Sequence, residues 1–78
     1  MNKIKSRMEK LLDFLESKNI NFKVKTLKDG SNKLNLIQIN KRYEKIVKNK
    51  FNYFMYFNDS IHLINICNKA DFDKFNRA

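Results

Sequence analysis

The chain has 78 residues and contains no proline, no tryptophan, one glycine, one cysteine and one histidine. A single cysteine excludes an intramolecular disulfide framework and a cysteine-rich zinc site. Cys67 lies in the apolar run 61–67, where we expect a buried, inert thiol. The longest uninterrupted apolar run, 53–57, is far too short to cross a bilayer, and the basic N-terminus is not followed by the apolar stretch of a signal peptide. We therefore expect an intracellular, cytoplasmic protein that makes no contact with membranes.

Acidic side chains are also scarce, because 8 Asp and Glu stand against 17 Lys and Arg, for a net charge of +9. Residues 1–50 hold fourteen of the basic and five of the acidic side chains, so the whole charge excess lies in this part of the chain. Lysine outnumbers arginine fourteen to three, which suits attraction to phosphates better than bidentate reading of bases. This asymmetry favours a polyanionic partner, either DNA, RNA or a nucleoprotein complex.

The apolar pattern predicts one small domain over residues 1–78, with its stability modest unless a partner or a second copy helps. Apolar residues recur at helical spacing over about 2–18 and alternate over 20–25. The segment 28–32 contains Asp-Gly and predicts a hairpin turn, with a return strand over 33–40. In that strand Leu36 and Ile37 are adjacent, so it is either buried on both faces or carries a bulge.

The second half predicts another hairpin between two helices. For 40–50 we expect a short helix capped by Asn40, the alternative being a strand through 43–47. Strands over 51–57 and 61–67 flank a turn at 58–60, and Asn68 caps a helix over 69–77 that carries Phe72 and Phe75 on one side. The fold class is therefore α+β, in the order α-β-β-(α)-β-β-α: a small antiparallel sheet of two hairpins with an N-terminal amphipathic helix and a short C-terminal helix, the helices on one face.

The same patterns predict the core. We expect it to contain residues from the first helix and from every strand, namely Leu11, Leu12, Leu15, Phe22, Val24, Ile37, Phe54, Ile64 and Ile66.

The basic residues give the candidate nucleic-acid-binding positions. Lys23 and Lys25 point to one side of a strand about 7 Å apart, and Lys28 and Lys33 flank the turn. We expect Lys23 and Lys25 to form one patch with the most basic stretch, 41–50. The alternatives are that the strand lysines protect a sheet edge and that the helix charges only solvate the surface. The full candidate set is Lys3, Arg7, Lys10, Lys23, Lys25, Lys28, Lys33, Lys41, Arg42, Lys45 and Lys48.

The aromatic run 51–57 has two interpretations. Open sheet faces that bind single-stranded nucleic acid carry aromatic residues for base stacking, but this run lacks the glycine and basic residues found there. A central strand packed on both faces is favoured, because a small domain needs such residues for its core. For stacking, Tyr53 and Tyr56 are preferred over phenylalanine, because a hydroxyl tolerates partial exposure.

Enzymatic chemistry is not expected, and neither is a metal or cofactor. His62 alternates with apolar residues, as in a strand, and has no orienting partner nearby in the sequence. One arrangement is similar to the D…(D/E)-x-K motif of metal-dependent nucleases. In this motif's order, the chain has a helix, then Asp29-Gly30 at a hairpin, then Gln38-Ile39-Asn40 on the return strand. Gln38 lacks the carboxylate and Asn40 the ammonium, however, so a divalent cation has little to hold it.

The sequence thus predicts a small basic accessory protein that binds nucleic acid, mainly by phosphate-backbone contacts, of viral or mobile-element character. The alternative is a protein-binding inhibitor, such as an anti-CRISPR or another phage-encoded antagonist of a nucleic-acid-processing complex. Homo-oligomers are compatible with both.

The expected absence of catalytic and metal-binding residues leads to a testable prediction. Nucleic-acid binding should be unchanged in His62→Ala and Cys67→Ser and insensitive to EDTA, because neither residue nor a metal is expected to take part. Filter binding with folded variants measures this. Loss of binding in either variant, or its recovery only on addition of Mg²⁺, would contradict the binding-module interpretation.

Overall fold

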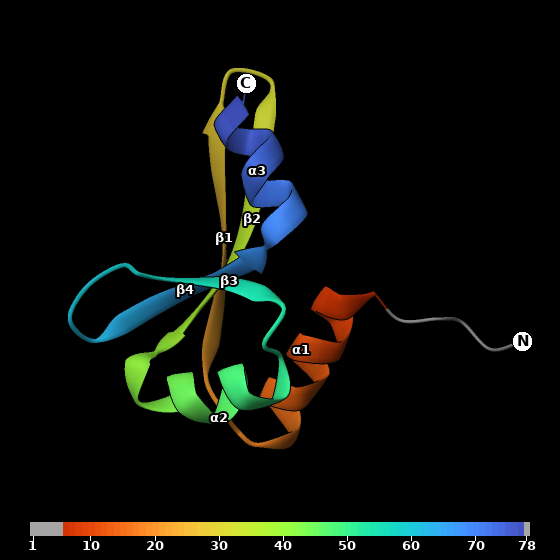
Figure 1. The fold of residues 1–78 in the computed structure, drawn as a ribbon. Coiled ribbons are helices and arrows are strands. Elements are labelled where there is room, and N and C mark those ends of the chain that lie inside the picture. Colours follow the sequence, from red (N-terminus) through yellow and green to blue (C-terminus); the bar gives the residue numbers. More distant parts are fainter. Residues whose placement is uncertain (1–5, 78) are drawn as a thin grey trace, which may run out of the picture.

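The computed structural model describes residues 6–77 and has the expected order of elements, α-β-β-α-β-β-α (Figure 1). The four strands form one antiparallel sheet in the order β1-β2-β4-β3. No helix within residues 6–77 is long and apolar enough to cross a membrane. The elements are α1 (Arg7–Ser17), β1 (Phe22–Asp29), β2 (Asn32–Asn40), the 3₁₀ helix η1 (Lys41–Tyr43), α2 (Glu44–Lys50), β3 (Phe54–Asn58), β4 (Leu63–Asn68) and α3 (Lys69–Arg77).

Short polar side chains set the helix starts. The Ser6 hydroxyl accepts a hydrogen bond from the Glu9 N–H (3.2 Å) at the start of α1. Asn40 accepts from the Arg42 N–H (2.9 Å), which confirms the helical reading of 40–50 and excludes the strand alternative. Asn68 accepts from the Ala70 N–H (3.0 Å) at the start of α3. Each contact satisfies a backbone donor that the first helical turn leaves unpaired.

The first hairpin turns one residue later than the Asp-Gly pair suggests. Asp29 is paired with Asn32, so Gly30 and Ser31 are the two central turn residues. Gly30 has φ +65, and Ser31 is not among the residues with positive φ. This is the pattern of a type II′ turn, in which glycine occupies the first central position.

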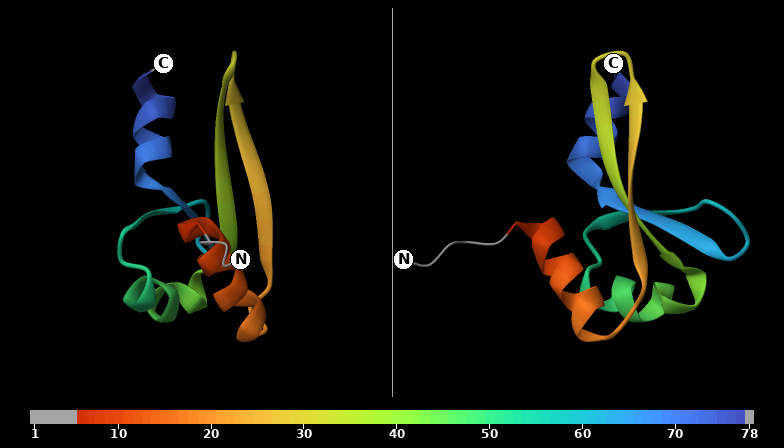
Figure 2. Two further views of the ribbon diagram at one scale, coloured as in Figure 1. Left: turned by 90° about the vertical axis from the view of Figure 1, so that its right-hand side faces the viewer. Right: turned by 180° about the vertical axis from the view of Figure 1, so that it is seen from behind.

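The helices pack on both faces of the sheet, which corrects the expectation of a single covered face. Along β2, Ile37 and Ile39 point to the face covered by α1 and α2, while Leu34 and Leu36 point to the face covered by α3. We call these the α1 face and the α3 face. The sheet twists so strongly that β3 and β4 cross the β1–β2 hairpin in Figure 1, and the edge view in Figure 2 (left) shows α2 and α3 beside opposite ends of that hairpin.

Most of the predicted core is confirmed, with three differences. Leu11, Leu15, Ile37, Phe54, Ile64 and Ile66 are buried, whereas Leu12 and Phe22 are partly buried. Val24 is 57% exposed, because β1 is an edge strand and no helix covers Val24 there. The predicted core omitted several residues that are buried, namely Ile20, Leu34, Leu36, Ile39, Val47 and Phe51, whereas Cys67 is buried as expected. Leu36 and Ile37 are both buried in a continuous register, so β2 has no bulge.

The second hairpin also differs from the sequence prediction. β3 begins at Phe54 rather than at residue 51, and it is the other edge strand rather than a central one. Its side chains are nevertheless shielded on both faces, since Phe54 and Tyr56 join the α1-face core and Met55 and Phe57 join the α3-face core. β4 begins at Leu63, so His62 lies in the loop before it and not in a strand.

The contrast between Leu11 and Val24 is a test of this packing. Leu11→Ala should lower the free energy of unfolding by about 2–5 kcal/mol, because the fully buried side chain leaves a cavity. Val24→Ala should cost less than about 1 kcal/mol, since its side chain is mostly in water. Urea unfolding followed by circular dichroism measures both, and equal losses would contradict the facing of α1 and β1.

Candidate nucleic-acid interface

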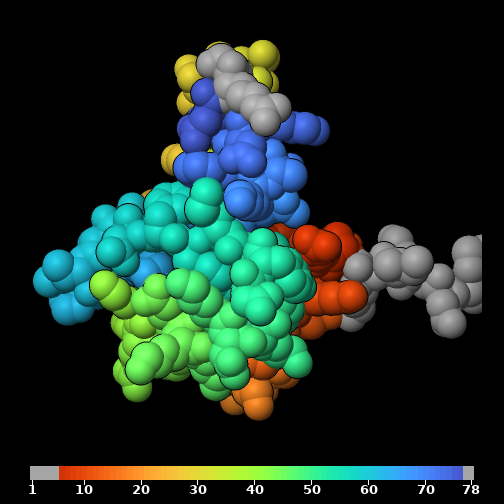
Figure 3. Space-filling view, viewed as in Figure 1, coloured from red at the N-terminus to blue at the C-terminus, as the bar shows by residue number. Residues whose placement is uncertain are grey.

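Residues 41–50, here called the basic segment, are the most basic stretch of the sequence. The segment comprises η1 and α2 and exposes Lys41, Arg42, Lys45, Lys48 and Lys50. Lys41, Lys45 and Lys48 follow one another at i, i+4 and i+7, so they lie along one side of the helical turns. Within residues 6–77, none of these five cations is in an ion pair with a carboxylate. The segment faces the viewer in the lower, green part of Figure 3.

Aromatic rings order several cations around this segment. The Lys48 Nζ lies 5.6 Å from the centroid of the Tyr56 ring, and the Lys50 Nζ lies 5.4 Å from that of Phe14. Lys18, at the end of α1, is 5.9 Å from the same Phe14 ring. Such contacts restrict the side chains while leaving their charges in water. Lys18 and Lys50 are not among the candidate binding positions predicted from the sequence. The i, i+4 spacing of Phe14 and Lys18 offered a signal for Lys18, but the contact of Lys50 with Phe14 is tertiary.

Other predicted positions are more dispersed. Arg7 and Lys10 are exposed on α1, where the Arg7 guanidinium lies 4.5 Å from the Tyr53 ring centroid. Lys28 and Lys33 are paired across the hairpin near its tip, at the end opposite α2 in Figure 1. Lys3 lies outside the described residues. The structure therefore separates the turn lysines from the basic segment.

Lys23 and Lys25 share the α3 face of β1 as expected, but their surroundings differ. The Lys25 Nζ lies 3.7 Å from an Asp59 carboxylate oxygen, so part of its charge is balanced. The same carboxylate accepts a hydrogen bond from the Gln38 side-chain amide, which also donates to Asn65 (3.2 Å). The bond to Asp59 ties the loop before β4 to β2, and the buried Gln38–Asn65 pair joins β2 to β4. Lys25 therefore already has a carboxylate partner, whereas the exposed Lys23 can contact an external anion.

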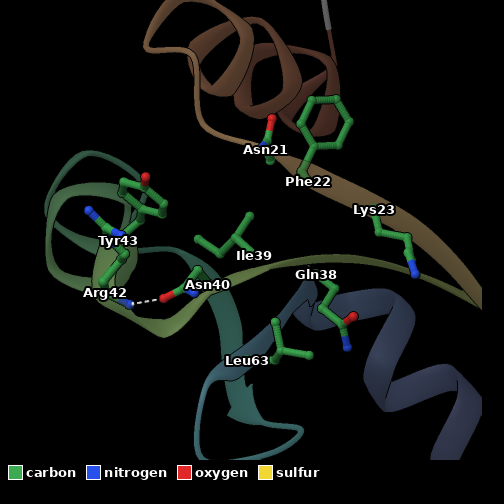
Figure 4. A pocket seen from close by; sticks show the side chains of 9 residues that line it. All are labelled: Asn21, Phe22, Lys23, Gln38, Ile39, Asn40, Arg42, Tyr43 and Leu63. Carbon is green, nitrogen blue, oxygen red and sulfur yellow. Dashed lines mark hydrogen bonds between the residues drawn. The ribbon is translucent and has the colours of Figure 1, made fainter.

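Lys23 meets the basic segment at an open groove of about 440 Å³ (Figure 4). The groove lies where β1 begins and β2 ends, on the part of the sheet that α3 does not reach. Its polar lining is Asn21, Lys23, Gln38, Asn40 and Arg42. Its apolar and aromatic lining is Phe22, Ile39, Tyr43 and Leu63.

The two tyrosines predicted to stack have different environments. Tyr53 is 38% exposed and packs edge-on to Phe51 beneath Arg7. Tyr56 packs against the α1-face core, and its hydroxyl donates to the Phe51 carbonyl oxygen at 2.5 Å. Burial raises the pKa of Tyr56 to about 12, with Tyr53 and Glu44 adding to the effect. Tyr56 is thus held in place by the fold, and base stacking by either ring stays a prediction.

The metal-ligating side chains are dispersed over residues 6–77. No group of three or more His, Cys, Asp or Glu side chains is close enough to hold a metal ion in that part of the chain. Asp29 is paired with Asn32 at the hairpin tip, whereas Gln38 is paired with Lys23, six positions further along the ladder. At the usual strand rise, Asp29 and Gln38 are therefore about 20 Å apart. The two residues of the nuclease-like pattern therefore do not meet.

Cys67 is fully buried against the α3-face core. Burial, with a smaller contribution from Asp71, raises the pKa of its thiol from 9.0 to about 11. The thiol therefore stays protonated at neutral pH and is a poor nucleophile, as the sequence predicted.

The raised pKa predicts a loss of stability in alkaline solution. Between about pH 9 and pH 11 the unfolded thiol loses its proton while the folded one retains it, so the free energy of unfolding falls as pH rises. Thermal melting across this range should show a shallower decline in Cys67→Ala than in the parent, although the variant is less stable at neutral pH. Parallel curves for the two proteins would contradict the pKa shift.

No protein-family model, curated protein or solved structure matches this chain. Its function therefore has to be inferred from the basic segment and from the groove beside it.

Proposed function

We propose that this protein binds nucleic acid inside the cell through contacts with the phosphate backbone, with the basic segment as its principal contact. The observation that carries the proposal is that five exposed cations occupy ten consecutive residues, with no carboxylate paired to them in the described structure. Unpaired cations on a surface retain their full attraction for an external polyanion.

The shape of the segment supports contact with several phosphates at once. Neighbouring positions at i, i+4 on a helix lie about 5–6 Å apart, so Lys41, Lys45 and Lys48 form a row rather than a single point of charge. Binding through such a row releases several condensed counterions, which gives affinity without sequence selection. The predominance of lysine fits this mode, because an ammonium group acts as a point charge toward phosphate.

Residues 51–78 carry no net charge, because their three basic side chains are balanced by three acidic ones. On α3, Lys69 and Lys74 are exposed beside Asp71 and Asp73, so cations and carboxylates are interleaved there. This helix provides a matched reference surface on the same protein.

The proposal is tested by charge reversal on these two surfaces. The double variant Lys41→Glu/Lys45→Glu should lower the affinity for a fluorescent oligonucleotide by more than about tenfold at low salt, because attraction becomes repulsion at two phosphate contacts. Lys69→Glu/Lys74→Glu changes the net charge by the same amount and should have a much smaller effect. All four substituted side chains are exposed, so thermal melting should be close to that of the parent.

Fluorescence anisotropy with DNA and RNA probes measures these affinities. Equal losses in the two double variants would indicate diffuse charge attraction without a site. No binding of bare nucleic acid by the parent would contradict the proposal and favour a protein partner.

A further inference from the structure

We infer that the groove between β1 and η1 binds an unpaired nucleotide of a single-stranded nucleic acid. The inference rests on the proposed function and names the form of nucleic acid that the protein prefers. It is carried by three properties of the groove: its size, its amide side chains, and the arginine–tyrosine pair at its rim.

The size fits one nucleotide. A volume of about 440 Å³ lies within the range of pockets that hold small molecules, roughly 300–1,000 Å³. Leu63, which is only partly buried, supplies an apolar surface on which the flat face of a base can rest. The groove is open to one side, so an extruded or unpaired base enters it without displacing protein. Bases within a duplex are stacked on their neighbours and do not present such a face.

The amides of the groove match the edges of bases. Each Asn or Gln side chain carries both a donor and an acceptor, which is the combination that base edges present. The Asn40 oxygen is occupied by the Arg42 N–H, which leaves its amide nitrogen to donate. The Gln38 nitrogen is occupied by Asp59 and Asn65, which leaves its carbonyl oxygen to accept. Asn21 is exposed on the opposite side of the groove and has both groups to offer.

Arg42 and Tyr43 lie next to each other at the rim of the groove, and each side chain ends in a planar group. The Arg42 guanidinium carbon lies 5.2 Å from the Tyr43 ring centroid, and Arg42 is exposed. Unpaired bases in protein complexes stack on aromatic rings and on guanidinium planes, so either plane can hold the base. A lysine at position 42 keeps the charge but supplies no plane.

The charges around the groove give the strand a path. Lys23 lies on one side and Arg42 on the other (Figure 4). Arg42 also follows Lys41, the first cation in the row of the basic segment. A strand whose base occupies the groove therefore has its flanking phosphates between Lys23 and Arg42 and continues onto Lys41 and Lys45.

The test compares a short single-stranded oligonucleotide with the duplex of the same sequence, as DNA and as RNA, by fluorescence anisotropy with the full chain. The single strand should bind about tenfold more tightly, since stacking of one base on an aromatic ring supports a preference of that order. Arg42→Lys should reduce single-strand binding by about fivefold and duplex binding by less, so that the preference for the single strand falls, because the charge is kept and only the plane is lost.

A second pair of variants separates the groove from net charge. Asn21→Asp places a carboxylate in the groove, and Asn76→Asp makes the same change at an exposed position on α3. Asn21→Asp should weaken single-strand binding several-fold more than Asn76→Asp, while the two should affect duplex binding equally. Melting curves confirm that each variant is folded.

The outcomes distinguish this inference from the proposed function. Equal affinity for single strand and duplex, or equal effects of Asn21→Asp and Asn76→Asp, would overturn the groove as a nucleotide site while leaving backbone binding intact. Failure of both probes to bind would overturn both.

Discussion

The structure depends on burial of β2 on both of its faces. Leu34 and Leu36 pack under α3, whereas Ile37 and Ile39 pack under α1 and α2, and β2 is also hydrogen-bonded to β1 and to β4. β3 pairs with β4, α3 contacts β2, β3 and β4, and α1 and α2 contribute to the α1-face core that also contains residues of β2 and β4. Apolar residues make up 42% of the chain, which is enough for a small core only. Because β2 is buried on both faces, two small core clusters share a single sheet.

This arrangement also explains where the candidate interface lies. α3 covers the part of its face that holds Leu34, Leu36 and Cys67, whereas Gln38 and Asn40, further along β2, line the groove. β2 then passes directly into the basic segment through the Asn40 cap. The polar groove and the row of cations are therefore neighbours in space because they are neighbours along the chain, at the point where a buried strand becomes an exposed helix.

Local sequence patterns predict most of this fold and less of the candidate site. The caps at Asn40 and Asn68, the double burial of β2 and the facing of Phe72 and Phe75 follow from short-range rules that need no tertiary information. The exposure of Val24 and the edge position of β3 depend on strand order, which alternation along one strand does not determine. The pairing of Lys25 with Asp59 and the meeting of Lys23 with Arg42 likewise join residues far apart in the chain. The sequence therefore indicates which residues are cationic, but not which of them lie together in the fold.

The central claim, that the basic segment binds phosphates, is tested most directly by the salt dependence of binding. The logarithm of the association constant for a single-stranded oligonucleotide should fall linearly with the logarithm of the salt concentration, with a slope of about −0.7 for each phosphate neutralised. A row of three lysines flanked by Arg42 and Lys23 predicts a slope of roughly −2 to −4. A slope near zero, or no binding even at low salt, would contradict the account.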